Sequence, residues 1–362
     1  MTVEQPTSEA DLERFVLFHD DVYAERSARW IASPAFHVPF LAGRSPFAVD
    51  RRMQAFVACQ HGKIVARVLA MIDERYQRLW KEPVGHLSFF EALPGFSQAT
   101  RQMIDVACRW LAEYGATAAR AGMGALEFPF AVEDHETLPP CFLRQNPAYY
   151  QTLLKQADFE TEKGLVDYRI RVTPERIAAW EGLVEAGRRN GFELVPLAAL
   201  PEERRAREFL RAYNTPFLGH WGYSPWTEDE LVVTFRAFEP FGMLEHSLVA
   251  YRAGEPMGSV WVQADASAMA RLTPGRTLRA EEKVNFLGIG VLEPARGSGL
   301  NLAMAAHTYL EFARKGYEYV SYTLVLDDNW PSRRTAEKLG AQVCNNYLVY
   351  CRRLVRSCRP LA

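Results

Sequence analysis

The sequence predicts a mixed α/β fold built from two lobes that share one order of elements. Three observations support this prediction: a hairpin signal in each half, an amphipathic helix after a strand in each half, and a length of 362 residues, which suits two domains. Each half is expected to contain a hairpin, a strand, a loop, a helix, a strand, a helix and a last strand. Because the residues themselves do not repeat, the halves share a pattern and not a sequence.

The first half opens with a predicted hairpin. Its apolar runs, 53–59 and 64–72, flank a polar turn with Gly62, as a short hairpin needs. A strand is expected over 85–93, and a helix over 98–114 because apolar residues recur there at helical spacing. The later elements of this half are a strand over 116–123, a helix over 149–158 and a strand over 165–172.

The second half repeats this order. The apolar runs 247–252 and 257–263 flank a turn with Gly and Pro, and a strand is expected over 284–292. A helix follows over 300–315 and ends at Gly316, because glycine favours the end of a helix. The last elements are a strand over 319–326, a helix over 331–339 and a strand over 343–354.

One helix is expected to join the two lobes. Thr173 can cap this helix, Pro174 suits its first position, and Asn190-Gly191 is a good end signal. The predicted organisation is therefore a first lobe over 1–172, a linker helix over 173–191 and a second lobe over 192–362.

The composition is that of an ordinary globular protein and argues against several function classes. With 48% hydrophobic residues, 24% charged residues and a net charge of −2, the chain shows no basic run that predicts nucleic-acid binding. No window holds the ~20 apolar residues of a membrane helix. The polar, acidic N-terminus does not resemble a secretory signal, so a cytoplasmic protein without nucleic-acid or membrane partners is expected. The six cysteines form no C-x-x-C pair and are expected to be free thiols.

Residues 296–299, Arg-Gly-Ser-Gly, form a basic glycine loop between a predicted strand and a predicted apolar helix. The first N–H groups of a helix have no partner inside it, and the helix dipole there favours negative charge. Gly297 and Gly299 leave room for a phosphate to touch the backbone, and Arg296 adds a positive charge. The order strand, loop, helix therefore predicts a phosphate site, with a plain turn as the alternative.

The second half resembles the GNAT (GCN5-related N-acetyltransferase) superfamily, whose members use acyl-CoA. Residues 296–301 stand where the family has Gln/Arg-x-x-Gly-x-Gly/Ala; Arg296 and Gly299 match, and Asn301 replaces the last small residue. The resemblance implies that the loop holds the CoA pyrophosphate through its N–H groups.

The end of the chain resembles the same family. Residues 337–341, Glu-Lys-Leu-Gly-Ala, look like the family's Glu-Lys-Leu-Gly-Phe ending, and Asn329 stands where the family has an Asn beside the pantetheine arm. Ala336 replaces the tyrosine that in many members protonates the departing thiolate. The first half looks like a degenerate copy, because residues 94–99 contain no Arg-Gly-x-Gly. The whole chain resembles the tandem GNAT proteins of bacteria, which implies two GNAT lobes.

The resemblance implies that acetyl-CoA or another acyl-CoA binds in the second lobe as the donor; no metal is expected. The implied cofactor-binding residues are Gly290, Val291, Arg296, Gly297, Ser298, Gly299, Leu300, Asn301 and Asn329.

Acyl transfer to an amine needs a base, an acid and donors to the oxyanion. Glu282, at the start of the strand before the loop, is the predicted base, with a solvated strand end as the alternative. Tyr347 is the predicted acid, and Tyr322 and Tyr350 are further candidates; for each of them a tyrosine packed within its strand is the alternative. A backbone N–H near 287–289 is the predicted oxyanion donor. The glycines of that strand indicate either a close approach of the thioester to the backbone or a packing contact.

Residues 213–226 are dense in aromatic residues, Gly and Pro. In GNAT enzymes this region covers the acceptor, so it implies a pocket for a small-molecule amine. The alternative is an aromatic plug at the lobe interface. The predicted substrate-binding residues are Asn214, His220, Trp221 and Tyr223.

The sequence therefore predicts an acyl-CoA-dependent N-acyltransferase that transfers an acyl group, for instance acetyl, to an amine by direct attack. The motif contains no Cys–His or Ser–His pair that would point to a covalent intermediate. One alternative is a protein that binds or senses acyl-CoA without turnover, which Asn301 and Ala336 favour. Another is an acyltransferase that takes its acyl group from a carrier protein.

Overall fold

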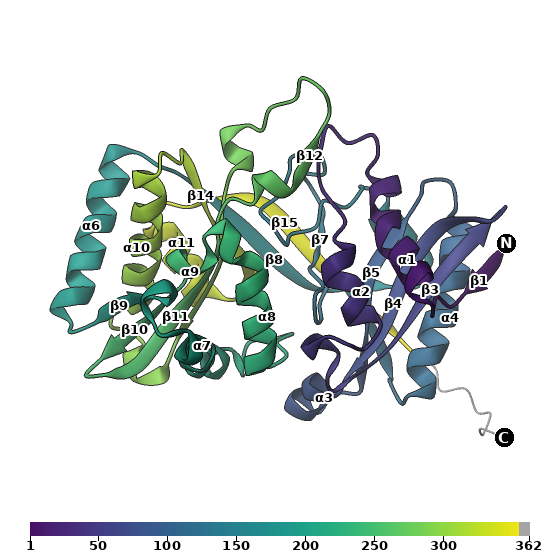
Figure 1. Ribbon diagram of the computed structural model, residues 1–362, viewed down its shortest axis with the longest axis horizontal. Coiled ribbons are helices and arrows are strands. Elements are labelled where there is room, and N and C mark those ends of the chain that lie inside the picture. Colours follow the sequence, from purple (N-terminus) through teal and green to yellow (C-terminus); the bar gives the residue numbers. More distant parts are fainter. Residues whose placement is uncertain (355–362) are drawn as a thin grey trace.

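The computed structural model describes residues 1–354, which form two lobes side by side (Figure 1). The first half contains, in chain order, β1 (Thr2–Glu4), α1 (Glu9–Val22), β2 (Ala28–Trp30), α2 (Pro34–Leu41), β3 (Arg51–Gln60), β4 (Lys63–Asp73), α3 (Glu74–Trp80), β5 (Val84–Ala92), α4 (Ser97–Glu113), β6 (Ala118–Ala121), β7 (Phe130–Ala131), α5 (Tyr150–Gln156) and β8 (Glu160–Arg171). The predicted hairpin is formed by β3 and β4, and the predicted helix over 98–114 is α4. Helices α1, α2 and α3 have no counterpart among the predicted elements.

The second half contains every element predicted for it, together with two strands and three helices that have no counterpart among the predicted elements. Its elements are α6 (Pro174–Arg189), β9 (Glu193–Pro196), α7 (Glu202–Phe217), α8 (Glu228–Phe238), α9 (Met243–His246), β10 (Leu248–Arg252), β11 (Glu255–Gln263), β12 (Ala270–Leu272), β13 (Phe286–Val291), α10 (Leu300–Arg314), β14 (Tyr319–Leu326), α11 (Trp330–Lys338) and β15 (Gln342–Arg353). The predicted mixed α/β fold is confirmed.

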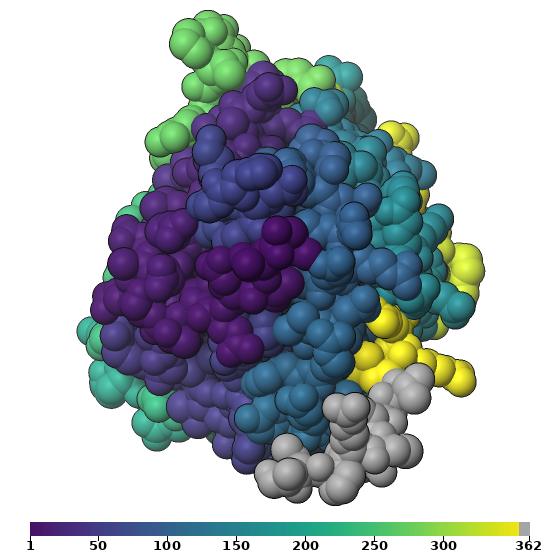
Figure 2. Space-filling view, turned by 90° about the vertical axis from the view of Figure 1, so that its right-hand side faces the viewer, coloured from purple at the N-terminus to yellow at the C-terminus, as the bar shows by residue number. Residues whose placement is uncertain are grey.

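The last strand of each half lies in the sheet of the other half. Strand β8 pairs with β14, and β15 pairs with β6. The two exchanged strands also pair with each other, so a nine-stranded sheet runs through both lobes in the order β1-β3-β4-β5-β6-β15-β8-β14, with β7 beside β15. Figure 1 shows β8 and β15 between the lobes, and Figure 2 shows yellow C-terminal residues beside the blue part of the first lobe. The boundaries 1–172 and 192–362 stay a prediction, and strand pairing crosses them.

A four-stranded sheet, β13-β11-β10-β9, completes the second lobe. Helix α6, which occupies the predicted linker, positions the helix that follows the glycine loop. Thr173 caps α6 as predicted, and a Cβ at Gly187 would lie 2.7 Å from Cβ of Ala303, so α6 and α10 pack closely. Just beyond α6, Asn190 Nδ2 donates to the Ser298 carbonyl (3.1 Å). Helix α6 and the residue after it therefore contact both α10 and the glycine loop.

The cysteines of the described residues, Cys59, Cys108, Cys141, Cys344 and Cys351, are free thiols as predicted. Cys358 lies outside the described residues. Among residues 1–354 there is no helix with the length and apolar character of a membrane span.

Candidate functional site

The candidate site lies where strands β13 and β14 separate. Each strand has a partner on its outer side, β11 for β13 and β8 for β14. Asn285 exchanges hydrogen bonds with the backbone of Ser321 (2.9 and 3.0 Å). Thr323 Oγ1 contacts the N–H and the C=O of Leu287 (3.0 and 2.8 Å). Beyond Leu287, no hydrogen bond joins the two strands within the described residues, and the edge of β13 is open.

The open edge of β13 presents the backbone of Ile289 and Val291. Backbone polar groups point to alternate sides along a strand. Leu287 faces β14 through Thr323, and the N–H of Leu292 donates to Met257 of β11 (2.9 Å). Ile289 and Val291 therefore direct their N–H and C=O groups into the gap.

The two glycines of β13 make packing contacts with α7. A Cβ at Gly288 would lie 2.9 Å from the Tyr213 hydroxyl, and one at Gly290 would lie 3.1 Å from Pro216 Cγ. Their backbone groups face β11, not the gap. Their small size lets α7 cover β13 closely.

The glycine loop leads from β13 directly into α10. Gly297 and Gly299 have φ of +77° and +80°, a region that favours glycine. No hydrogen-bond acceptor within residues 1–354 contacts the N–H groups of residues 299–302. Arg296 is exposed beside them, and Ser298 Oγ donates back to the Ala295 carbonyl (2.6 Å). The loop thus offers free N–H donors and a positive charge, which suits a phosphate.

Two of the predicted cofactor-binding residues form hydrogen bonds with helix α11. Asn301 Nδ2 donates to Thr335 Oγ1 (2.7 Å), so its side chain ties α10 to α11. Asn329 caps α11, because its Oδ1 accepts from the Ser332 N–H (3.3 Å), and it also lines the cavity described next. Leu300 is fully buried and anchors the start of α10 in the core.

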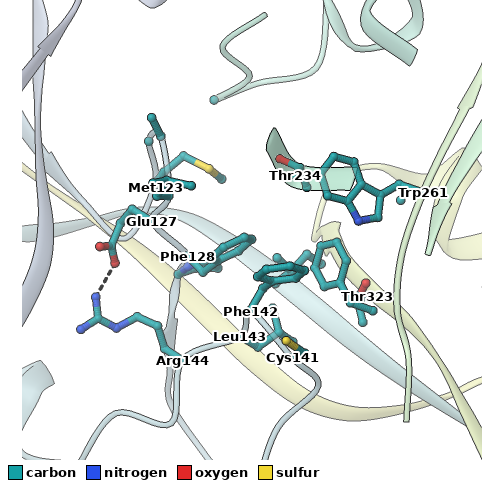
Figure 3. A pocket seen from close by; sticks show the side chains of 18 of the residues that line it. Met123, Glu127, Phe128, Cys141, Phe142, Leu143, Arg144, Thr234, Trp261 and Thr323 are labelled. Carbon is teal, nitrogen blue, oxygen red and sulfur yellow. Dashed lines mark hydrogen bonds and ion pairs between the residues drawn. The ribbon is translucent and has the colours of Figure 1, made fainter. Parts of the chain in front are cut away.

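A cavity of about 620 Å³ opens from the gap between β13 and β14 and extends between the lobes to α1 and α2. Its centre is aromatic: the rings of Phe128, Phe142 and Phe286 have centroids 5.7 to 6.0 Å apart. Figure 3 shows Phe128 and Phe142 in the middle, the Glu127–Arg144 pair on one side and Trp261 with Thr323 on the other. Strand β12 pairs with β2, so the two halves also meet at the N-terminal part of the chain.

Most charged groups that line the cavity form ion pairs, and Arg67 instead donates to the backbone carbonyls of Phe15 and Val16. Arg144 contacts Glu127 and Glu91. Burial raises the pKa of Glu91, but the hydrogen bond with His19 and the charge of Arg144 outweigh it and hold this pKa at about 2.

A second buried network crosses the lobe interface. Arg51 binds Asp73 (2.8 Å) and Glu230 (2.7 Å), and Arg75 also binds Glu230 (2.5 Å). Glu230 lies at the start of α8, so this network fixes the second lobe against the first.

The aromatic segment 213–226 forms one wall of the cavity. His220, Trp221 and Tyr223 line it. Asn214 does not; its amide accepts from the Tyr223 hydroxyl and donates to the Trp226 carbonyl (2.9 Å), so it shapes the wall from behind. Burial lowers the pKa of His220, which favours the neutral imidazole.

The two predicted catalytic residues lie outside the cavity lining. Glu282 is buried, and its carboxylate binds Arg276 (2.5 Å) and the N–H groups of Arg279 (2.8 Å) and Leu138 (3.2 Å). Tyr347 is also buried, at a point where β15 pairs with both β7 and β8. These are the surroundings of structural residues.

Another predicted candidate, Tyr322, does line the cavity. Its hydroxyl forms a hydrogen bond with Ser332 Oγ (3.0 Å), beside Asn329 at the start of α11. Burial raises the pKa of Tyr322, so the phenol stays protonated. Ser332, Thr323 and Trp261 also line the cavity and were not found from the sequence. Thr323 alone left a signal, as a polar residue in an apolar strand.

No protein-family model matches this sequence. Among curated proteins, "Protein YghO" of Escherichia coli (strain K12) is 22% identical in an alignment of 369 positions that covers 94% of this chain and 92% of that protein.

Three solved structures are similar in fold across nearly the whole chain. A tandem GNAT protein from the clavulanic acid biosynthesis pathway has a TM-score of 0.58 at 12% identity and covers 98% of this chain and 99% of its own. A GCN5-related N-acetyltransferase from Sphaerobacter thermophilus has a TM-score of 0.52 at 14% identity, with 98% and 95% covered. A fungal multi-domain β-N-acetylglucosaminidase with a glucosamine N-acetyltransferase region has a TM-score of 0.58 at 15% identity; 97% of this chain matches, but it spans only 38% of that protein. The chain therefore has the fold of the tandem GNAT proteins.

Proposed function

We propose that the protein is an acyl-CoA-dependent N-acyltransferase whose donor binds in the second lobe. The observation that carries the proposal is the continuity between the open edge of β13 and the glycine loop after it. The free N–H groups of residues 299–302 suit a pyrophosphate, and the Ile289 carbonyl together with the backbone of Val291 suits the amides of a pantetheine arm. A small-molecule amine is the proposed acceptor; the fungal neighbour contains a region described as a glucosamine N-acetyltransferase.

The cavity supplies groups for each step of direct transfer. The amine nitrogen attacks the thioester carbonyl, a C–N bond forms, and the C–S bond breaks. The N–H of Ile289 stabilises the oxyanion, because the N–H of Leu287 is already bonded to Thr323. His220 accepts the amine proton, and Tyr322, bonded to Ser332, donates a proton to the CoA thiolate. Glu282 and Tyr347 take no part in this mechanism.

Acetyl-CoA binding to the Gly299→Val variant tests the donor site. A side chain at φ +80° distorts the loop and moves its N–H groups, so loss of one or two charged hydrogen bonds lowers affinity by roughly 10- to 100-fold. The matched control is Gly275→Val, which changes an exposed glycine of similar φ, +82°, outside the site. Equal affinity in Gly299→Val and wild type, or no binding to wild type, refutes the proposal.

A non-catalytic acyl-CoA-binding protein is the second candidate, and one observation favours it. Ala336 replaces the family's usual acid and is fully buried in α11, so that position offers no proton donor. CoA release measured over a panel of primary amines separates the two functions. Acyl-CoA binding with no release on any amine supports the binding protein, and amine-dependent release supports the enzyme.

A further inference from the structure

The cavity extends far beyond the point where a thioester would sit. It reaches from Ile289 and Thr323 in the second lobe to Val16 and Phe36 of α1 and α2 in the first. A volume of about 620 Å³ lies within the range of sites that enclose a drug-sized ligand. An acetyl group fills only a small part of it.

The direction of the donor follows from the strand and the loop. The phosphate end of the donor lies at residues 299–302, after the C-terminal end of β13. A pantetheine arm on the open edge runs back along β13 from Val291 to Ile289. The acyl group therefore points toward Phe286, where the aromatic centre of the cavity begins.

The cavity walls suit an apolar occupant. Phe128, Phe142 and Phe286 surround its centre, and Leu143 and Leu165 also line it. The lining holds three guanidinium groups and three carboxylates, so its formal charges balance: Arg51, Arg67, Arg144, Glu91, Glu127 and Glu230. Arg51 and Arg144 are ion-paired, whereas Arg67 donates to the backbone carbonyls of Phe15 and Val16.

We propose that the acyl donor carries a long hydrocarbon chain, which lies in the inter-lobe cavity. The proposal rests on the function proposed above and names its donor class. The chemistry is unchanged: the amine takes the long acyl group, an amide forms, and CoA leaves as the thiol after protonation by Tyr322. The first lobe then acts as the receptor for the end of the chain.

Equilibrium binding of CoA, acetyl-CoA, octanoyl-CoA and dodecanoyl-CoA to the full chain tests this proposal without knowledge of the acceptor. Each buried methylene tightens binding by up to about fourfold, so dodecanoyl-CoA is expected to bind at least ~100-fold more tightly than acetyl-CoA.

Two variants fill the cavity away from the proposed catalytic groups. Ala125→Trp adds bulk from the first lobe, and Thr234→Phe does so from α8. Each is expected to weaken dodecanoyl-CoA binding at least ~10-fold and leave CoA and acetyl-CoA binding within about twofold. The control is Ala35→Trp, at an exposed position of α2 outside the lining. Thermal melting shows which variants are folded, and either folded variant suffices.

The outcomes are distinct. If CoA and acetyl-CoA bind but chain length has no effect, the long-chain proposal is wrong and the donor site stands. If no CoA species binds, the proposed function fails as well. Dodecylamine is tested with saturating CoA: if it binds, loses affinity in Ala125→Trp, and dodecanoyl-CoA binds no better than acetyl-CoA, the chain belongs to the acceptor and the donor assignment is overturned.

Discussion

Each lobe contains a pair of strands that separate. The lobes differ in whether the strand edge exposed by this separation is open or covered by side chains. In the second lobe, the edge of β13 at Ile289 and Val291 is open. In the first lobe, β5 pairs with β6 only as far as Leu87, and its end is covered by side chains. The Tyr150 hydroxyl accepts from the N–H of Ala92 (2.9 Å), and the Tyr149 hydroxyl donates to the Ala92 carbonyl (2.7 Å).

The loops that lead from these strands into the next helices also differ, because only the second lobe has a basic glycine loop. Helix α4 follows Leu93-Pro-Gly-Phe96, a loop without a basic residue, whereas α10 follows the Arg-Gly-Ser-Gly loop. Arg144 of the first lobe is turned inward and donates to the Phe90 carbonyl of β5. The first lobe therefore fills the gap between its own separating strands with side chains and supplies walls for the cavity that opens from the second lobe.

The largest expected effect is on catalysis, through His220→Ala. Removal of a general base is expected to lower kcat about 10²- to 10⁴-fold with little change in acetyl-CoA affinity. Because burial lowers the pKa of His220, the wild-type rate rises with pH through a value below that of an ordinary histidine. Amine-dependent CoA release measured over a pH series checks both points. His61→Ala, in an exposed turn, is the control, and an unchanged pH profile in His220→Ala would rule out the base role.

The role of strand β8 in shaping the gap between β13 and β14 can be tested at Asp167. Its carboxylate accepts from the N–H of Leu324, which has φ +50° at a bulge of β14 and lines the cavity (3.3 Å). Burial raises its pKa from 3.8 to about 7. The free energy of unfolding therefore falls as the pH rises from about 4 to about 7 and levels off above that range, because only the unfolded state loses the proton there.

Asp167→Asn is expected to remove this part of the pH dependence, as urea unfolding at several pH values shows. The exposed Asp229→Asn serves as the control. Parallel pH profiles for wild type and Asp167→Asn would contradict the assignment.

Tyr150→Phe tests the side-chain contacts that cover the end of β5 in the first lobe. The hydroxyl contacts Glu91 (2.5 Å) as well as Ala92, so its loss is expected to cost about 1–3 kcal/mol of stability. Acetyl-CoA affinity should not change, because the donor lies in the other lobe. Tyr114→Phe, at a half-exposed site, is the control for thermal melting and calorimetric binding. A tenfold change in affinity would mean that the first lobe holds CoA.

The smallest effect is expected for Asn301→Ala, which restores a small residue in the loop motif. It removes the hydrogen bond to Thr335 and costs about 0.5–1.5 kcal/mol. Acetyl-CoA affinity should stay within about twofold, since the backbone N–H groups are unchanged. Loss of binding in this variant, measured beside its melting temperature, would show that the Asn301 side chain itself contacts the donor.

Local patterns predicted the second half from its hairpin onward, because helix spacing, the hairpin turn and the glycine loop are short-range signals; helices α7, α8 and α9 have no counterpart in that prediction. The exchange of β8 and β15 could not be predicted, since the partner of a strand is not encoded in its own alternation. The place of Glu282 at a strand start predicts a base, but the preceding loop brings Arg276 into an ion pair with it. Tyr347 looked like Tyr322 in the sequence; only pairing with β7 and β8 shows that one is buried in the sheet and the other lines the cavity.

A crystal structure of the protein with bound CoA tests the central claim most directly. The account predicts the pyrophosphate within hydrogen-bond distance of the N–H groups of residues 299–302 and the pantetheine arm along Ile289 and Val291. CoA seated against β5 and α4 in the first lobe, or away from both pairs of separating strands, would contradict it.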